Sequence, residues 1–234
     1  MISNIVNLTY LLLTLATPKQ SPMVGAWETK DDDGNTISMI ITDDYFSVAG
    51  YKESPAEFVF TLGGSWSMEG NMTNILYEFN TLDKSLVGTS DSFEMTIMDN
   101  KLTGNGLTWT RVDKGKPGKL QGAWLITGRK RDGEISMRTP GARKTMKILS
   151  GTRFQWIAFN SETGEFSGTG GGTYTTKSGR YTENIEFFSR DNSRAGAELG
   201  FDYSLEAGSW HHSGLSSTGN PIYEVWETRE SLGI

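Results

Sequence analysis

The chain has 234 residues, a formal net charge of −6 at pH 7 and no cysteine. The absence of cysteine excludes disulfide bonds, thiol nucleophiles and thiolate metal sites, and the acidic balance argues against a general affinity for nucleic acid. A chain of this length forms either one large β domain or two domains of about 100 residues each.

Residues 1–20 contain the apolar run Tyr10–Ala16, which is too short to cross a bilayer as a helix. An apolar run of this length near the start of a chain, followed by small residues, indicates an export signal. The stretch before it has no Lys or Arg, so a loosely packed N-terminal arm is the alternative. We therefore expect a secreted or periplasmic protein without a transmembrane span.

Residues 23–113 alternate between apolar and polar side chains, which is the period of half-buried β-strands. The alternation recurs in about eight short segments separated by turn residues, with no amphipathic helix pattern between them. Representative apolar stripes are Ile37, Met39 and Ile41; Phe58, Phe60 and Leu62; Ile75, Tyr77 and Phe79; and Phe93, Met95 and Ile97. This half of the chain is therefore expected to form an antiparallel sheet.

Residues 114–120 are rich in Lys, Gly and Pro and predict a linker, after which residues 121–230 repeat the first half. Gly25-Ala26-Trp27 and Gly122-Ala123-Trp124 open the two copies, which close on Trp109-Thr110-Arg111 and Trp226-Glu227-Thr228-Arg229. Because closing a sheet on itself removes its exposed edges, we predict an all-β protein of two tandem eight-stranded antiparallel barrels.

The repeated Trp and Arg indicate how each barrel closes. A guanidinium from the last strand can lie over the indole of the first strand while it donates hydrogen bonds to nearby carbonyls. Trp109 and Arg111 are two positions apart, whereas Trp226 and Arg229 are three apart. Since side chains on a strand alternate between its faces, the two closures differ unless a bulge intervenes.

These motifs resemble the lipocalin signature, in which an Arg on the last strand packs across the Trp of a Gly-x-Trp motif on the first strand. The second copy is more closely similar to bacterial lipocalin-like (calycin-type) families of membrane or secreted proteins, through Gly122-Ala123-Trp124, Gly170–Tyr174, Tyr181–Glu186 and Glu224–Glu227. The resemblance covers nearly all of residues 121–230 and is weaker over 24–112. It implies tandem lipocalin-like barrels and export, and it implies no established chemistry.

The two copies differ in charge. Residues 21–113 carry fifteen acidic and five basic side chains, whereas residues 114–234 carry thirteen acidic and sixteen basic ones. Opposite signs favour docking of the two barrels, although two differently solvated surfaces would show the same pattern. Phe154 and Trp156 lie on one face of a predicted strand, and Ile157 and Phe159 on the other. We expect one face to line the barrel and the other to contact the partner barrel.

A strand predicted over Tyr181–Phe187 places its alternate residues Tyr181, Glu183, Ile185 and Phe187 on one face. That face is the more apolar one, so Glu183 is expected inside the second barrel. A buried carboxylate is costly unless it is paired or hydrogen-bonded. Glu183 is therefore a polar anchor for a ligand, an acid/base group, or a structural carboxylate satisfied by a neighbouring donor.

His211 and His212 are strand neighbours that point to opposite faces, so they cannot readily chelate one metal. One of the two is expected to look inward, and His212 shares its face with Trp210. His212 with Glu183 could then form a pair for ligand binding or proton transfer. The alternative is a core Trp flanked by partly exposed histidines.

Aromatic side chains and a basic insertion complete the candidates. Phe154, Trp156, Tyr203 and Tyr223 could line a cavity with the residues above, although in a filled barrel the same side chains are simply core. The insertion at residues 128–145 holds Arg129-Lys130-Arg131, Arg138, Arg143 and Lys144. It is either a basic lid that attracts an anion or a solvated loop that packs on the acidic first barrel.

The resulting hypothesis is an exported lipocalin-like protein that binds a small, partly apolar ligand, with an anion as one option, in the second barrel. The predicted ligand-binding residues are Glu183, Tyr181, Trp156, Phe154, Tyr203, His212, Trp210 and Tyr223. The first barrel is expected to serve mainly as a docking partner. The alternatives are an envelope or cell-surface interaction module without an internal ligand, and an enzyme using Glu183 with a His or Tyr. No catalytic triad, metal-ligand cluster or cofactor motif stands out in the sequence, and no nucleic-acid partner is expected.

Overall fold

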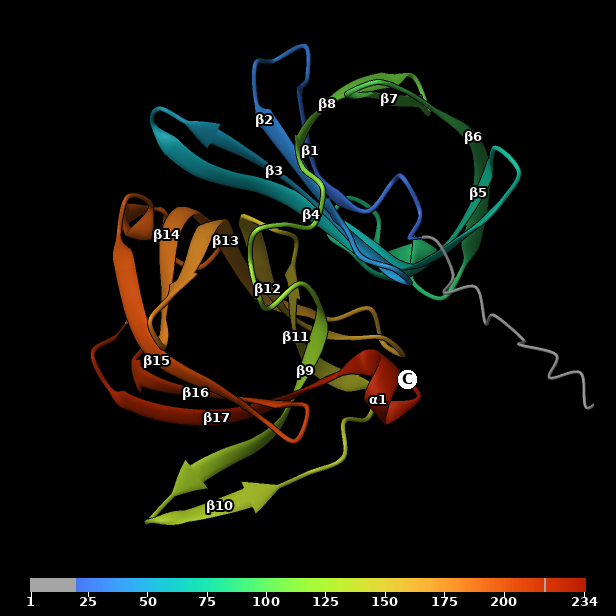
Figure 1. Ribbon diagram of the computed structural model, residues 1–234. Coiled ribbons are helices and arrows are strands. Elements are labelled where there is room, and N and C mark those ends of the chain that lie inside the picture. The colour runs from blue at the N-terminus through green and yellow to red at the C-terminus, as the bar shows by residue number, and fades with distance from the viewer. Residues whose placement is uncertain (1–19, 217) are drawn as a thin grey trace, which may run out of the picture.

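A computed structural model of the protein describes residues 20–216 and 218–234 (Figure 1). The chain forms two closed, eight-stranded antiparallel β-barrels in tandem, which confirms the predicted fold class. The export signal predicted for residues 1–20 falls almost wholly outside the described residues. Within the described part of the chain, no helix is long and apolar enough to cross a membrane.

The first barrel is a meander in which each strand pairs with the next and β8 pairs back to β1. Its strands are β1 (Gly25–Lys30), β2 (Thr36–Ile41), β3 (Tyr45–Glu53), β4 (Ala56–Glu69), β5 (Met72–Asn80), β6 (Ser90–Met98), β7 (Lys101–Gly104) and β8 (Leu107–Asp113), with the short 3-10 helix η1 (Lys84–Leu86) after β5. Strand alternation turns Met39 of β2 into the lumen core and Ile40 outward to the second barrel.

The second barrel has the same order, except that β10 forms a hairpin with β9 outside the closed ring. Its strands are β9 (Gly122–Arg131), β10 (Glu134–Met137), β11 (Arg143–Leu149), β12 (Arg153–Asn160), β13 (Phe166–Lys177), β14 (Arg180–Phe188), β15 (Glu198–Glu206), β16 (Ser209–Leu215) and β17 (Pro221–Thr228). The 3-10 helix η2 (Asn192–Arg194) follows β14, and the helix α1 (Arg229–Leu232) follows β17.

The duplication extends to local details of the backbone. Both copies carry a bulge at corresponding glycines, between Gly63 and Gly64 and between Gly171 and Gly172. A side chain at Gly64 or Gly172 would collide with a carbonyl oxygen of the neighbouring strand, so the backbones approach too closely for any other residue. In each copy the extra residue of the bulge, Glu78 or Glu186, lies on the following strand, β5 or β14, which bends in the same way in both barrels.

The first barrel closes as predicted. The Arg111 guanidinium carbon lies 3.8 Å from the centre of the Trp27 ring. Arg111 also donates hydrogen bonds to the carbonyls of Pro22 (2.7 Å) and Val24 (3.3 Å), and the Trp27 indole donates to Met23 (2.8 Å). One cation thus joins the last strand, the first strand and the segment that leads into it.

The corresponding closure predicted for the second barrel is wrong. Trp124 donates to the Leu120 carbonyl at 2.9 Å, as Trp27 does to Met23, but its ring packs edge-on against Trp210 at 5.7 Å. Arg229 instead lies over the ring of Tyr45 in the first barrel, at 3.8 Å. Arg229 is three positions after Trp226 and is the first residue of α1, beyond the end of β17 at Thr228, so its side chain does not share the inward face of Trp226 and points out of its own barrel.

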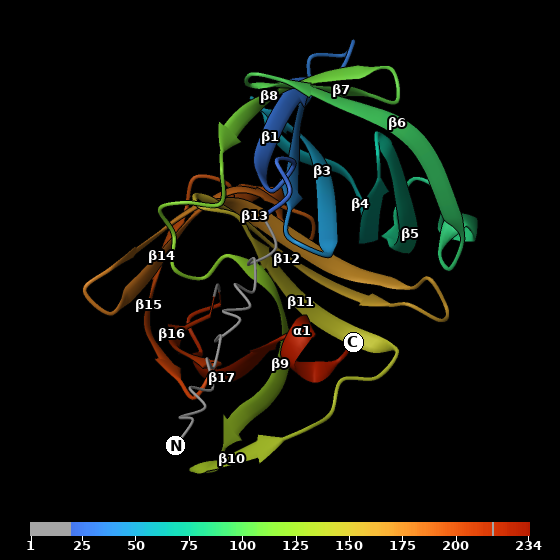
Figure 2. The same ribbon diagram turned by 45° about the vertical axis from the view of Figure 1, so that its right-hand side comes forward.

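The outer walls of the barrels pack against each other, which confirms the predicted docking (Figure 2). The apolar contact consists of Ile40, Phe79, Ala123, Leu125, Met146, Ile148, Ile157 and Phe159, so the outward stripe of β12 faces the partner barrel as expected. Polar contacts flank it. The Tyr51 hydroxyl donates to Glu186 at 2.6 Å, and Arg153 pairs with both Glu186 and Glu28 of β1.

Candidate ligand-binding site in the second barrel

The lumen of the second barrel contains a cavity of about 310 Å³ whose wall combines ionisable and aromatic side chains. The charged lining residues are Arg129, Lys147, Glu183, Arg190 and Glu224, and the rings are those of Trp156, Phe188, Phe201, His212 and Trp226. Three cations against two carboxylates leave this lining with a surplus of one positive charge while the imidazole is neutral.

Lys147 and Glu183 form an ion pair inside the lumen. Lys147 on β11 lies between Met146 and Ile148, whose side chains contact the first barrel, so strand alternation turns Lys147 inward. Its Nζ is 2.7 Å from Glu183 Oε1, and the two side chains are only 7% and 5% exposed. Tyr181 donates a hydrogen bond of 2.8 Å to the same oxygen. The inward-facing carboxylate predicted from the sequence is therefore held by two donors.

Aromatic rings surround the Lys147 ammonium. Its Nζ lies 4.9 Å from the ring centre of Tyr181, 5.1 Å from Trp210, 5.5 Å from Trp226 and 5.7 Å from Phe201. The negative faces of aromatic rings attract a cation, and this attraction offsets part of the cost of removing the ammonium from water. The Lys147 side chain is thus held in place within the lumen by rings from four residues.

His212 on β16 is buried beside Glu224 of β17. Its Nδ1 lies 3.5 Å from Glu224 Oε2, and Glu224 Oε1 lies 3.4 Å from Arg129 Nη2. The structure thus pairs His212 with Glu224, while Lys147 and Tyr181 occupy the Glu183 carboxylate. Of the predicted pairings of Glu183 with a His or a Tyr, the structure therefore brings together Glu183 and Tyr181, whereas His212 contacts Glu224.

Several buried polar atoms of this lumen have no hydrogen-bond partner among the described residues. The Nε2 of His212 and the indole Nε1 of Trp226 belong to side chains that line the cavity, and each residue is 2% exposed, while the Nδ1 of His212 has only its 3.5 Å contact with Glu224. The indole Nε1 of Trp210, in the adjoining core, has none either. Because buried polar groups in proteins are nearly always hydrogen-bonded, such a group of atoms indicates the position of a missing partner.

The predicted site residues fall into three groups. Glu183, Trp156 and His212 line the cavity, and Tyr181, Phe154 and Trp210 form the buried core against it, with Tyr203 half-buried at its edge. Tyr223 points away from the lumen, because its hydroxyl lies 2.9 Å from Nδ1 of the outward-facing His211. Phe187 also faces outward and stacks on Tyr51 at 4.9 Å, because the β14 bulge reverses the alternation after Ile185.

Sequence reasoning missed Lys147, Glu224 and Arg190 as lining residues. Lys147 and Glu224 each stand alone among residues of mixed polarity, and a single charge on a strand normally faces solvent. The available signal was the repeat itself, since Lys147 pairs with Trp124 as Met39, a predicted interior residue, pairs with Trp27. The basic insertion contributes Arg129 to the rim, while Figure 1 shows the β9–β10 hairpin reaching out beyond the barrel wall.

Comparison with known proteins finds no family model and no curated protein that matches this chain. The site must therefore be interpreted from its own geometry and chemistry.

His212 makes stability depend on pH. Burial lowers its pKa, and the charge of Lys147 lowers it further, against the opposing effects of Glu224 and Glu183. The native state therefore binds fewer protons than the unfolded state below the ordinary value of 6.5, and stability is lost as the pH falls through that value. We expect His212 to lower the free energy of unfolding by about 1 kcal/mol when the pH falls from 7.5 to 5.5.

The His212→Leu variant tests this dependence. Urea denaturation of both proteins at the two pH values should show the variant losing less stability on acidification, by that same amount. The raised pKa of Glu28 also contributes to the pH dependence, but it is common to both proteins and cancels in the comparison. Identical pH dependence in the two proteins would contradict a neutral, buried His212.

Proposed function

We propose that the protein is a lipocalin-like binding protein that takes up a small, partly apolar anion in the lumen of its second barrel. The observation that carries the proposal is the buried indole N–H of Trp226, which lines the cavity and has no hydrogen-bond partner among the described residues. An indole can only donate a hydrogen bond. A ligand that satisfies this donor bears an acceptor atom, as a carboxylate does.

The charges of the lining favour an anion over a neutral acceptor. Arg129 and Arg190 are exposed at the rim, and Lys147 lies buried in the interior. A lumen with a surplus of positive charge and walls of low polarity concentrates the field on an entering anion. Arg129 and Arg190 would then attract the ligand, and Lys147 would face its charged end.

The aromatic wall determines the size and polarity of the uncharged part of the ligand. Trp156, Phe188 and Phe201 line the cavity, whose volume of about 310 Å³ lies near the lower end of the range for small-molecule sites. An aromatic carboxylate or a short fatty acid combines the required apolar body with one negative group. The export of the protein rests on residues 1–20 and forms part of this proposal.

Isothermal titration calorimetry with two matched probes tests the proposal. Indole-3-acetate and tryptamine share an aromatic body and carry opposite charges, and we expect the carboxylate to bind at least about ten-fold more tightly. Trp226→Phe keeps the ring and removes the donor, so it should weaken indole-3-acetate binding about five-fold. Tyr223→Phe removes a hydroxyl outside the lumen and is the matched control. Equal binding of the two probes would overturn the proposal.

Native mass spectrometry of protein purified from its own host would identify the natural ligand. We expect a retained molecule with an acidic group. The same experiment on Glu183→Gln checks whether this carboxylate shapes the site, since the amide no longer holds Lys147 as an ion pair. Unchanged retention would remove Glu183 from the ligand-binding residues.

A further inference from the structure

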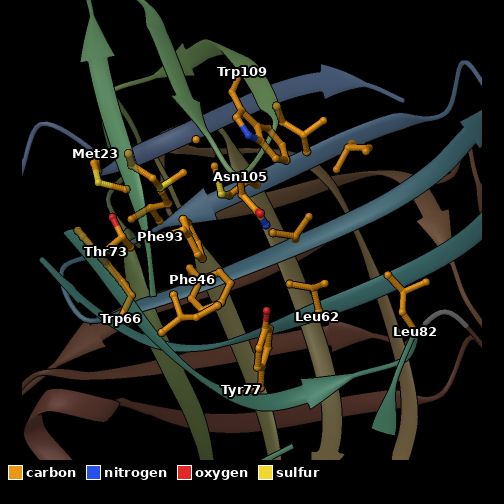
Figure 3. A pocket seen from close by; sticks show the side chains of 18 of the residues that line it. Met23, Phe46, Leu62, Trp66, Thr73, Tyr77, Leu82, Phe93, Asn105 and Trp109 are labelled. Carbon is orange, nitrogen blue, oxygen red and sulfur yellow. The ribbon is translucent and has the colours of Figure 1, made fainter. Parts of the chain in front are cut away.

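The first barrel contains a cavity of its own, of about 200 Å³, in the corresponding lumen (Figure 3). Its wall is built from Met, Ile, Leu, Val, Phe and Trp side chains, among them Met39, Phe46, Leu62 and Trp109. Among the described residues that line it there is no Lys, Arg, His, Asp or Glu. The expectation that this barrel serves mainly for docking leaves such a cavity unexplained.

The strand registers show that the two lumens have opposite chemistry at equivalent positions. Lys147 is equivalent to Met39, because they pair with Trp124 and Trp27, the corresponding residues of the two first strands. Glu183 is equivalent to Ile75 in the same way, through their partners Tyr174 and Trp66. The neighbouring pair His212 and Glu224 is equivalent to the pair Gly104 and Leu107. All four equivalents in the first barrel line its cavity. One scaffold thus holds a charged lumen and an apolar lumen.

The apolar wall holds a buried hydroxyl without a partner, in addition to the side chains of Tyr77 and Asn105. Thr73 is 2% exposed, lines the cavity, and its hydroxyl has no hydrogen-bond partner among the described residues. Figure 3 shows Thr73 near Met23 and Trp66, on the opposite side of the cavity from Leu82. Because an unpartnered buried hydroxyl is costly, Thr73 marks a place where a polar group of an occupant would be stabilised.

The cavity reaches the surface at its other side. Leu82 lines it and is 64% exposed, and Asn105, in the turn between β7 and β8, is exposed as well. An apolar side chain at this edge offers an entering apolar molecule a contact before it reaches the lumen. A dry apolar cavity of about 150 Å³ binds benzene in another protein, so about 200 Å³ accommodates a somewhat larger molecule.

We propose that the first barrel is a second, independent binding site for an uncharged, mostly apolar molecule of one or two rings that carries a single hydroxyl group bonded to Thr73. The site differs from the anion site in the second barrel in both charge and size. The protein then holds two ligands of different chemistry, one in each copy of the same scaffold.

The test compares 2-naphthol with naphthalene by titration monitored through the intrinsic Trp fluorescence and by calorimetry. We expect native protein to bind 2-naphthol about five-fold more tightly than naphthalene, because only the former satisfies Thr73. Thr73→Val has nearly the same shape and should bind the two probes equally. Failure of the native protein to bind either probe, or an unchanged preference in Thr73→Val, would overturn the proposal.

Two controls separate this site from the one proposed in the second barrel. Leu62→Trp fills the first lumen and should lower the affinity for both probes at least about ten-fold. Trp226→Phe should leave both affinities unchanged. Saturating indole-3-acetate should not displace 2-naphthol. Displacement, or loss of 2-naphthol binding in Trp226→Phe, would place the naphthol in the second barrel and refute a separate site. If Leu62→Trp does not fold, the Thr73→Val comparison decides alone.

Discussion

Replacing Arg229 with alanine is expected to lower the free energy of unfolding by about 3–5 kcal/mol, the range for breaking a buried ion pair. Arg229 is 2% exposed, and its two terminal nitrogens lie 2.5 and 2.7 Å from the two carboxylate oxygens of Glu78 in the first barrel. Its guanidinium also covers the ring of Tyr45 at 3.8 Å. Alanine would leave Glu78 without its cation at the contact between the barrels.

The matched control is Arg180→Ala. Arg180 also pairs with a carboxylate at 2.5 Å, that of Asp202, but the two side chains are 51% and 72% exposed. Water screens such a pair, so its loss should cost less than about 1 kcal/mol. Urea denaturation followed by circular dichroism and Trp fluorescence measures both variants. If Arg229→Ala is no less stable than Arg180→Ala, then Arg229 does not couple the barrels.

Arg229 also shows where sequence patterns succeed and fail. The repeated brackets and the period-two stripes predicted two tandem barrels, because closing a sheet and burying one of its faces are requirements of any such chain. The same brackets placed Arg229 over Trp124. One additional residue puts Arg229 past the end of the last strand, at the start of α1, and only the surroundings show that its outward side chain meets Tyr45 and Glu78 rather than solvent.

The candidate site was predicted in part for a related reason. The alternation of side chains along a strand correctly predicted that Glu183 and Trp156 face the lumen, because each shares a strand face with other residues of the barrel interior. It failed for Phe187, where a bulge shifts the register, and bulges depend on how closely neighbouring backbones approach. Lys147 was missed because its partner lies 36 residues away along the chain, on a different strand.

The duplication explains how a charged lumen is tolerated at all. Both barrels rely on the same strand order, the same glycine bulges and the same Trp-to-carbonyl hydrogen bond on the first strand. The first barrel shows that the scaffold closes around an apolar lumen. We therefore expect the ion pair of the second barrel to be dispensable for the fold, since it carries a desolvation cost that an apolar lining avoids.

The Lys147→Met variant should consequently lose about 3–5 kcal/mol of unfolding free energy, because Glu183 would remain buried with only the Tyr181 hydroxyl as partner. The Lys147→Met, Glu183→Ile double variant carries the residues that the first barrel has at these positions. It should recover most of that loss and equal or exceed the native stability, since well-packed apolar residues often replace a buried pair without penalty. Denaturation of Lys147→Met, of Glu183→Ile and of the double variant measures the coupling between the two positions.

The same variants separate stability from binding. If the Lys147–Glu183 pair exists to hold a charge in the lumen, the double variant should be stable and yet bind indole-3-acetate at least about ten-fold more weakly than the native protein. A double variant as unstable as Lys147→Met would show that the pair is required for folding. A stable double variant with native affinity would show that the anion, if it binds, does not depend on Lys147. Stability without binding is the outcome that a functional ion pair requires, because an apolar lining supports the barrel but leaves an incoming carboxylate without a cation.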